Sequence, residues 1–172
     1  MQLLGVRSGI LGIGIGSRIS DEGFSKAVRN LTKLEEVDIC NLSSYSLEVL
    51  GQSCPFLKSL KFVNTNAEAF VVYGDAEAIA IGKTMPALRH LFIKENDLTD
   101  VGLVAILDGC PLLETLHLEE CYQLDLTESL LKRCVTQIKD FQLSNMYNHG
   151  DQCPYAHYVG PGDEDDYIYL FG

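Results

Sequence analysis

The chain has 172 residues, 47% of them hydrophobic, which is enough for one folded domain or a short repeat array. Its 24 Asp and Glu residues outnumber its 13 Lys and Arg residues, so the formal net charge at pH 7 is −11. This excess argues against binding to nucleic acid or to an anionic membrane, both of which need clustered cations. No apolar run reaches the roughly 18 residues that a membrane-spanning helix needs.

One pattern, Leu-x-x-Leu-x-Leu with Val, Ile or Phe replacing some Leu residues, recurs five times along the chain. The first residues of successive copies are 23, 31, 25 and 25 positions apart. This pattern, at a period of about 20–29 residues, is typical of a leucine-rich-repeat solenoid, in which each unit supplies one strand and one helix. In chain order the copies are Leu34–Val37–Ile39, Leu57–Leu60–Phe62, Leu88–Leu91–Ile93, Leu113–Leu116–Leu118 and Ile138–Phe141–Leu143.

The repeats predict an α/β fold with short parallel strands on a concave face and helices on the convex face. We assign residues 1–148 to the leucine-rich-repeat domain and residues 149–172 to an acidic, aromatic-ended C-terminal tail. A curved stack of strands is suited to holding another protein, so protein binding is the expected function.

The first repeat is expected to be degenerate. Aligned with the later repeats, Leu11 matches Leu116, so residues 10–13 are predicted to form a strand. The glycine-rich run over residues 12–17 lacks the Lys of a Walker loop and the spacing of a dinucleotide-binding fingerprint, so nucleotide binding is not favoured. Residues 1–20 also lack the basic start and the cleavage site of a secretory signal.

A helix is expected before each later strand. Ser20 and Thr99 stand in the same register and are predicted N-caps, each followed by an Asp in the first helical turn. Apolar residues ten positions before a repeat's first Leu should point from the helix into the core: Phe24, Leu47 and Leu103. Prolines two positions before that Leu should end the helices: Pro55, Pro86 and Pro111.

The 31-residue interval indicates an insertion. The extra residues lie near Asn66–Tyr73, just after a strand, and are predicted to form a longer loop before a helix over residues 75–84.

The six cysteines are interpreted as packing residues rather than as a disulfide framework. Four of them lie at or near positions that recur with the repeat: Cys54, Cys110, Cys121 and Cys134. Such positions are typical of buried thiols that act as small hydrophobic side chains. With no secretory signal, we expect a reducing compartment, the cytoplasm or the nucleus.

Two arrangements could suggest chemistry, but neither is favoured. His149, Cys153 and His157 are spaced four apart, yet Pro154 and Gly150 argue against the helix that would align them as metal ligands. A Cys-His or Ser-His-Asp nucleophile would need a thiol or hydroxyl beside a His, and the cysteines stand mostly at core positions. We expect no enzymatic activity, no metal and no cofactor.

Two interpretations of the tail are open. Its acidic residues, with no Lys or Arg, are typical of disorder. Alternatively, its aromatic end, Tyr167–Phe171, folds back to cover the last repeat.

The residues between the repeat leucines should face the concave surface, because side chains alternate along a strand. The first and the fourth strand carry acidic residues, and the strands between them are basic and aromatic. Phe92, beside Arg89 and His90, is of the kind that anchors an interface. The candidate protein-binding residues are Lys58, Lys61, Arg89, His90, Phe92, Lys94, Glu114, His117 and Glu119.

Three stretches carry a resemblance to a known family. Residues 85–91, 98–111 and 131–134 with 137–140 resemble plant F-box/leucine-rich-repeat proteins, as does the opening Ser20–Gly23, and the likeness extends over about residues 19–145. This resemblance implies the substrate-recognition part of an SCF-type ubiquitin ligase receptor, acting in ubiquitin-dependent protein degradation. In that family an F-box docks on a Skp-type adaptor, and the repeats present a protein target.

The sequence departs from the family in one respect. Only about nineteen residues precede the first clear repeat helix, so no F-box is expected within the chain. A Skp-type adaptor is therefore an expected partner only if an F-box exists outside this chain. The alternatives are a truncated or decoy repeat protein with no ligase link, or an enzymatic or metal-binding role of the tail.

Overall fold

The computed structural model describes residues 5–7, 9–12, 19–64, 74–144 and 158–159. Eight strands form one sheet in chain order: β1 (Gly5–Arg7), β2 (Ile10–Gly12), β3 (Glu36–Cys40), β4 (Ser59–Val63), β5 (His90–Lys94), β6 (Thr115–Glu119), β7 (Asp140–Ser144) and β8 (Tyr158–Val159). The helices are α1 (Asp21–Val28), α2 (Ser44–Ser53), α3 (Ala76–Thr84), α4 (Asp100–Gly109) and α5 (Glu128–Gln137).

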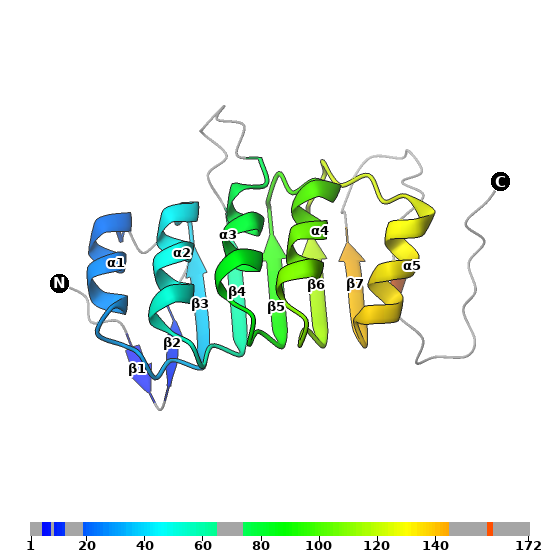
Figure 1. The fold of residues 1–172 in the computed structure, drawn as a ribbon. Coiled ribbons are helices and arrows are strands. Elements are labelled where there is room, and N and C mark those ends of the chain that lie inside the picture. The colour runs from blue at the N-terminus through cyan, green and yellow to red at the C-terminus, as the bar shows by residue number, and fades with distance from the viewer. Residues whose placement is uncertain (1–4, 8, 13–18, 65–73, 145–157, 160–172) are drawn as a thin grey trace.

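Strands β2 to β7 are parallel, and each pairs with the next strand in the chain. The helices stand side by side in a layer over one face of this sheet (Figure 1). At the two edges, β1 and β8 pair antiparallel with β2 and β7. The predicted α/β leucine-rich-repeat solenoid is confirmed.

The register of the sheet follows the repeat pattern residue by residue. The second members of the pattern form one row across six strands, which begins at Leu11 in β2 and ends at Phe141 in β7. Both of these side chains are fully buried. The strand predicted over residues 10–13 is therefore confirmed, at Ile10–Gly12.

The predicted helix signals act as expected. The Ser20 hydroxyl accepts a hydrogen bond from the Gly23 backbone N–H at 3.1 Å, and the Thr99 hydroxyl accepts one from Val101 at 3.2 Å. Helices α2, α3 and α4 each end before the predicted proline. The predicted core residues Phe24, Leu47 and Leu103 are all fully buried.

Neighbouring helices are tied together at their N-terminal ends. The Asp21 carboxylate of α1 accepts hydrogen bonds from the Ser43 N–H at 2.9 Å and the Ser43 hydroxyl at 2.8 Å, and also from the Ser46 hydroxyl. Asp75, just before α3, accepts the Thr99 N–H at 2.8 Å and its hydroxyl at 2.7 Å. An acidic residue at one helix start therefore holds the cap of the next helix, beyond its favourable interaction with the helix dipole.

The central helices approach one another through glycine. A Cβ placed on Gly82 of α3 would collide with the carbonyl oxygen of Ala105 in α4, and one on Gly109 would collide with the carbonyl of Gly82. The backbones of α3 and α4 are therefore in direct contact, which leaves no room for a side chain at either glycine.

The five cysteines in the described ranges are buried, which confirms their interpretation as core residues. Burial raises the pKa of Cys54 to about 11 and that of Cys110 to about 12. Thiols with such pKa values are poor nucleophiles at neutral pH.

Several predicted segments lie outside the described residues. They are the loop at Asn66–Tyr73, residues 13–17 of the glycine-rich run, the spaced His149, Cys153 and His157, and the aromatic end Tyr167–Phe171. Within the segment assigned to the tail, β8 pairs with β7. The repeat pattern does not predict β8. None of the helices in the described ranges has both the length and the apolar character required to cross a membrane.

Candidate functional site

The candidate residues lie on the face of the sheet that the helices do not cover. We call this surface the strand face; it is the concave side of the predicted solenoid. On β5, Leu91 points into the core and is 1% exposed, so its neighbours His90 and Phe92 point away from the core. The same alternation holds on β4 and β6, where Leu60 and Leu116 are buried.

The register of β4, β5 and β6 places six outward side chains in two rows. One row is Ser59, His90 and Thr115, and the other is Lys61, Phe92 and His117. These six residues, with Leu60 and Leu91, line an open hollow of about 330 Å³. We call it the central hollow. It brings together four of the nine predicted residues: Lys61, His90, Phe92 and His117.

Phe92 stands at the middle of the central hollow and is half-buried. The Lys61 ammonium lies 5.6 Å from the centroid of its ring, a distance at which the cation is attracted to the ring face. The aromatic side chain and the amine therefore form one contact surface, apolar at its centre and cationic at its side.

Each histidine of the central hollow has a polar neighbour on the next strand. Nδ1 of His90 lies 3.2 Å from the Thr115 hydroxyl, and Nε2 of His117 lies 3.0 Å from a carboxylate oxygen of Asp140. These contacts orient both rings. None of the five cysteines in the described ranges lines the hollow.

The other predicted residues lie at the ends of the strands and are joined by ion pairs between neighbouring repeats. At the strand starts, Lys58 pairs with Glu35 at 2.7 Å, and Glu114 pairs with both Arg89 and Lys139. These pairs are largely exposed, so each contributes little to stability.

At the opposite ends of β5 and β6, Lys94 pairs with Glu119 at 2.8 Å and with Glu120 at 3.3 Å. Hydrogen bonds to the carboxylates of Glu119 and Glu120 raise the pKa of Lys94, and they outweigh partial burial, which lowers it. At the strand starts, hydrogen bonds from Lys139 and then Arg89 lower the pKa of Glu114. The acidic and basic strands expected from the sequence thus neutralise one another in pairs.

Three residues of the site have no place among the nine candidates. Ser59 and Thr115 line the central hollow, and Asp140 holds His117. The signal that identifies them is the repeat register, because each stands one position before the second member of its repeat pattern.

The described part of the chain contains no group of three or more His, Cys, Asp or Glu side chains arranged to hold a metal ion. The strand face presents an aromatic ring, cations and hydroxyl groups.

Comparison with known proteins finds no matching family model. Three curated Arabidopsis thaliana proteins are similar to this chain. They are F-box/LRR-repeat protein 23 (47% identical over 130 residues), F-box/LRR-repeat protein 22 (40% over 132) and F-box protein SKIP19 (44% over 125). The matches cover 74%, 76% and 72% of this chain, but only 29%, 42% and 40% of these relatives.

Proposed function

Because the chain belongs to the plant F-box/leucine-rich-repeat family through its repeats, we propose that its strand face holds a protein target for an SCF-type ubiquitin ligase. The observation that carries this proposal is the central hollow. It places a half-buried Phe92 among Lys61, His90 and His117 on the face of the sheet that the described helices do not cover. Aromatic side chains with polar surroundings are the usual anchors of protein interfaces.

Two further observations support protein binding. The side chains around Phe92 come from three consecutive strands, so an extended partner would contact several repeats at once. The ion pairs at the strand ends, such as Lys58–Glu35, join side chains of neighbouring strands and so limit their freedom before a partner arrives. Ordering these side chains in advance reduces the entropy that is lost on binding.

Site-specific cross-linking tests where the target binds. A photoreactive phenylalanine is introduced at position 92, and, as a matched control, at Val101, which is 66% exposed on helix α4. Plant extract is irradiated with each variant. We expect a defined protein to be trapped from position 92 and not from position 101. Equal trapping from both positions would contradict the proposal.

The ligase link has a separate test. The trapped protein should accumulate when the proteasome is inhibited, and it should lose ubiquitin when the gene of this chain is deleted. An unchanged ubiquitin level in the deletion line would contradict the ligase link while leaving protein binding intact.

Adaptor binding is proposed only for an F-box outside these 172 residues. We therefore expect the purified chain alone not to capture a Skp-type adaptor in a pull-down. Robust direct capture would show that a part of this chain contacts the adaptor.

A further inference from the structure

We propose that the central hollow receives an acidic side chain, Asp or Glu, from an extended segment of the target. This inference rests on the proposed function, because it names the chemistry of the segment that the strand face holds.

The central hollow is lined without carboxylates in a chain that is rich in them. Asp and Glu supply 24 of the 172 residues, yet none of those that the structure describes lines the hollow. Its polar groups are the Lys61 ammonium, the rings of His90 and His117, and the hydroxyls of Ser59 and Thr115. The ammonium, the hydroxyls and an imidazole N–H can each donate a hydrogen bond, and a carboxylate accepts several such bonds at once. Two of these groups already face carboxylates outside the lining, Asp140 at 3.0 Å from His117 and Asp38 at 3.6 Å from Lys61, so a ligand carboxylate would share or replace those contacts. The hollow is therefore complementary to an anion.

Lys61 is the cation best placed to accept a new partner. Its ammonium lies 3.6 Å from the Asp38 carboxylate, and both side chains are about half exposed (49% and 53%). Exchange of so loose and solvated a pair for a ligand carboxylate costs little. By contrast, Lys94 is held by two carboxylates, at 2.8 and 3.3 Å, and is only 28% exposed.

The position of Phe92 predicts which kind of residue should lie next to the Asp or Glu of the bound segment. Its half-buried ring lies between Lys61 and His117 in the register of the strands, so an apolar group beside the ligand carboxylate would contact it. Burial of that apolar contact removes water from the Lys61 pair and strengthens the attraction between the charges. The favoured segment therefore combines an Asp or Glu with a neighbouring apolar residue.

The test uses a fluorescent peptide of sequence Gly-Ser-Asp-Leu-Asp-Ser-Gly and a matched peptide in which both Asp residues are Asn. Binding to the full 172-residue chain is followed by fluorescence anisotropy at low salt, because screening weakens exposed charge pairs. We expect the Asp peptide to bind at least about tenfold more tightly than the Asn peptide, a difference of about 1.4 kcal/mol. Equal affinity for the two peptides would overturn the proposal.

The chain offers a matched pair of variants. Lys83 on α3 also lies 3.6 Å from a carboxylate, that of Glu48, but on the helix layer and away from the hollow. Lys61→Glu and Lys83→Glu therefore change net charge equally. We expect Lys61→Glu to weaken binding of the Asp peptide about tenfold or more. Lys83→Glu should leave the affinity for this peptide within about twofold of the wild-type value. Similar losses in both variants would show non-specific attraction and overturn the proposal.

The outcomes separate this inference from the proposed function. If a target is trapped at position 92 and its affinity is the same for wild type and Lys61→Glu, the acidic-segment inference fails and protein binding stands. If the Asp peptide binds through Lys61 but no protein is trapped at position 92, the inference stands as a property of the hollow and the proposed function fails.

Discussion

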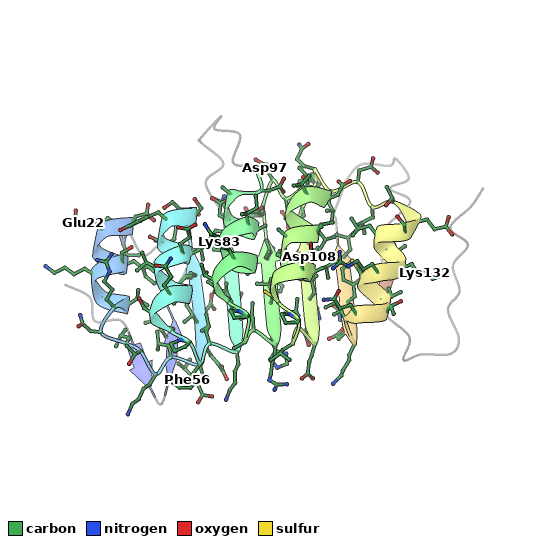
Figure 2. The ribbon with its side chains drawn as sticks, viewed as in Figure 1. Glu22, Phe56, Lys83, Asp97, Asp108 and Lys132 are labelled. Atoms are coloured by element: carbon green, nitrogen blue, oxygen red, sulfur yellow. The ribbon has the colours of Figure 1, made fainter. Side chains whose placement is uncertain are left out.

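The helix layer and the strand face obey different constraints, although each repeat contributes to both. In the helix layer, α3 and α4 meet backbone to backbone at Gly82 and Gly109, so even one added methyl group has no space. On the strand face, side chains such as Lys61 and Arg89 are about half exposed and paired across open surface. Substitutions should therefore affect folding when they fall in the helix layer and recognition when they fall on the strand face. Figure 2 shows the helix layer from its outer side, with Lys83, Asp108 and Lys132 on α3, α4 and α5.

The largest effect on stability is expected for a substitution at the contact between α3 and α4. Gly82→Ala places a methyl group against the Ala105 carbonyl, so the two helices must move apart. We expect the free energy of unfolding to fall by roughly 2–3 kcal/mol, as for other overpacked interiors. The measurement is urea denaturation followed by circular dichroism.

Gly74→Ala is the matched control, because a Cβ at Gly74 meets nothing within 4 Å. Its free energy of unfolding should stay within about 0.5 kcal/mol of wild type. If Gly82→Ala were equally mild, the helices would not be in fixed contact and the contrast between the two regions would fail.

A smaller loss is expected for Asp21→Ala. The variant removes a carboxylate that accepts hydrogen bonds from Ser43 and Ser46, and charged hydrogen bonds of this kind are worth about 1.5–3 kcal/mol. Because Asp21 is partly exposed, we expect a loss of about 1.5 kcal/mol at pH 7. Glu22→Ala, at the neighbouring exposed position, should have a much smaller effect.

The Asp21 contribution should depend on pH. Partial burial opposes ionisation, but the bonds from Ser46 and Ser43 outweigh it and lower the pKa below 3.8. The stabilisation is therefore complete above the unfolded-state pKa and is lost as the pH falls through the folded-state pKa. The stability gap between wild type and Asp21→Ala should close in acid; a constant gap would refute this role.

Glu77 on α3 is expected to have the opposite effect from Asp21, because its ionised carboxylate should lower the stability of the fold. It is 4% exposed, and its Oε2 has no hydrogen-bond partner among the residues that the structure describes. Burial, and then the charges of Asp75 and Asp97, raise its pKa. The ionised form therefore destabilises the fold, and Glu77→Gln should raise the free energy of unfolding at pH 7 by about 1 kcal/mol.

This gain should disappear in acid. As the pH falls below the raised folded-state pKa toward the unfolded-state value, wild-type Glu77 becomes protonated in the folded protein and its penalty is removed. Thermal unfolding of wild type and Glu77→Gln at several pH values measures the difference. A Glu77→Gln protein less stable than wild type at pH 7 would show that the carboxylate is needed there.

The smallest effect on stability is expected on the strand face. Arg89→Ala removes one partner of Glu114, which retains Lys139 at 3.0 Å. Exposed ion pairs contribute about 0–1 kcal/mol, so the unfolding free energy should change by about 0.5 kcal/mol or less. A loss above 1.5 kcal/mol would mean that the strand face also holds the fold together.

The strand register could be predicted from the sequence because it depends on a local pattern that repeats. Leu60, Leu91 and Leu116 recur at one position, and alternation along each strand then assigns His90 and Phe92 to the open face. Likewise, the helix starts at Ser20 and Thr99 could be predicted because the side chains of these residues cap the helices.

Features that depend on contacts between repeats could not be predicted in this way. The pairing of Glu114 with two cations depends on side-chain conformations across three strands. The antiparallel β8 has no repeat pattern. The close glycine contacts are an exception, because the sequence contains a sign of them: Gly51 and Gly82 both stand six positions before their repeat's first Leu.

The most direct test of the central claim is the affinity of the trapped target for strand-face and helix-layer variants of the chain. The double variant Arg89→Ala, Phe92→Ala should bind the target at least about tenfold more weakly, with an unchanged circular-dichroism spectrum, because it removes the aromatic anchor and the exposed cation just before the same strand. The helix-layer variant Val101→Ala, at a position 66% exposed, should bind as wild type does. Unchanged binding by the double variant, or an equal loss in Val101→Ala, would contradict the assignment of recognition to the strand face.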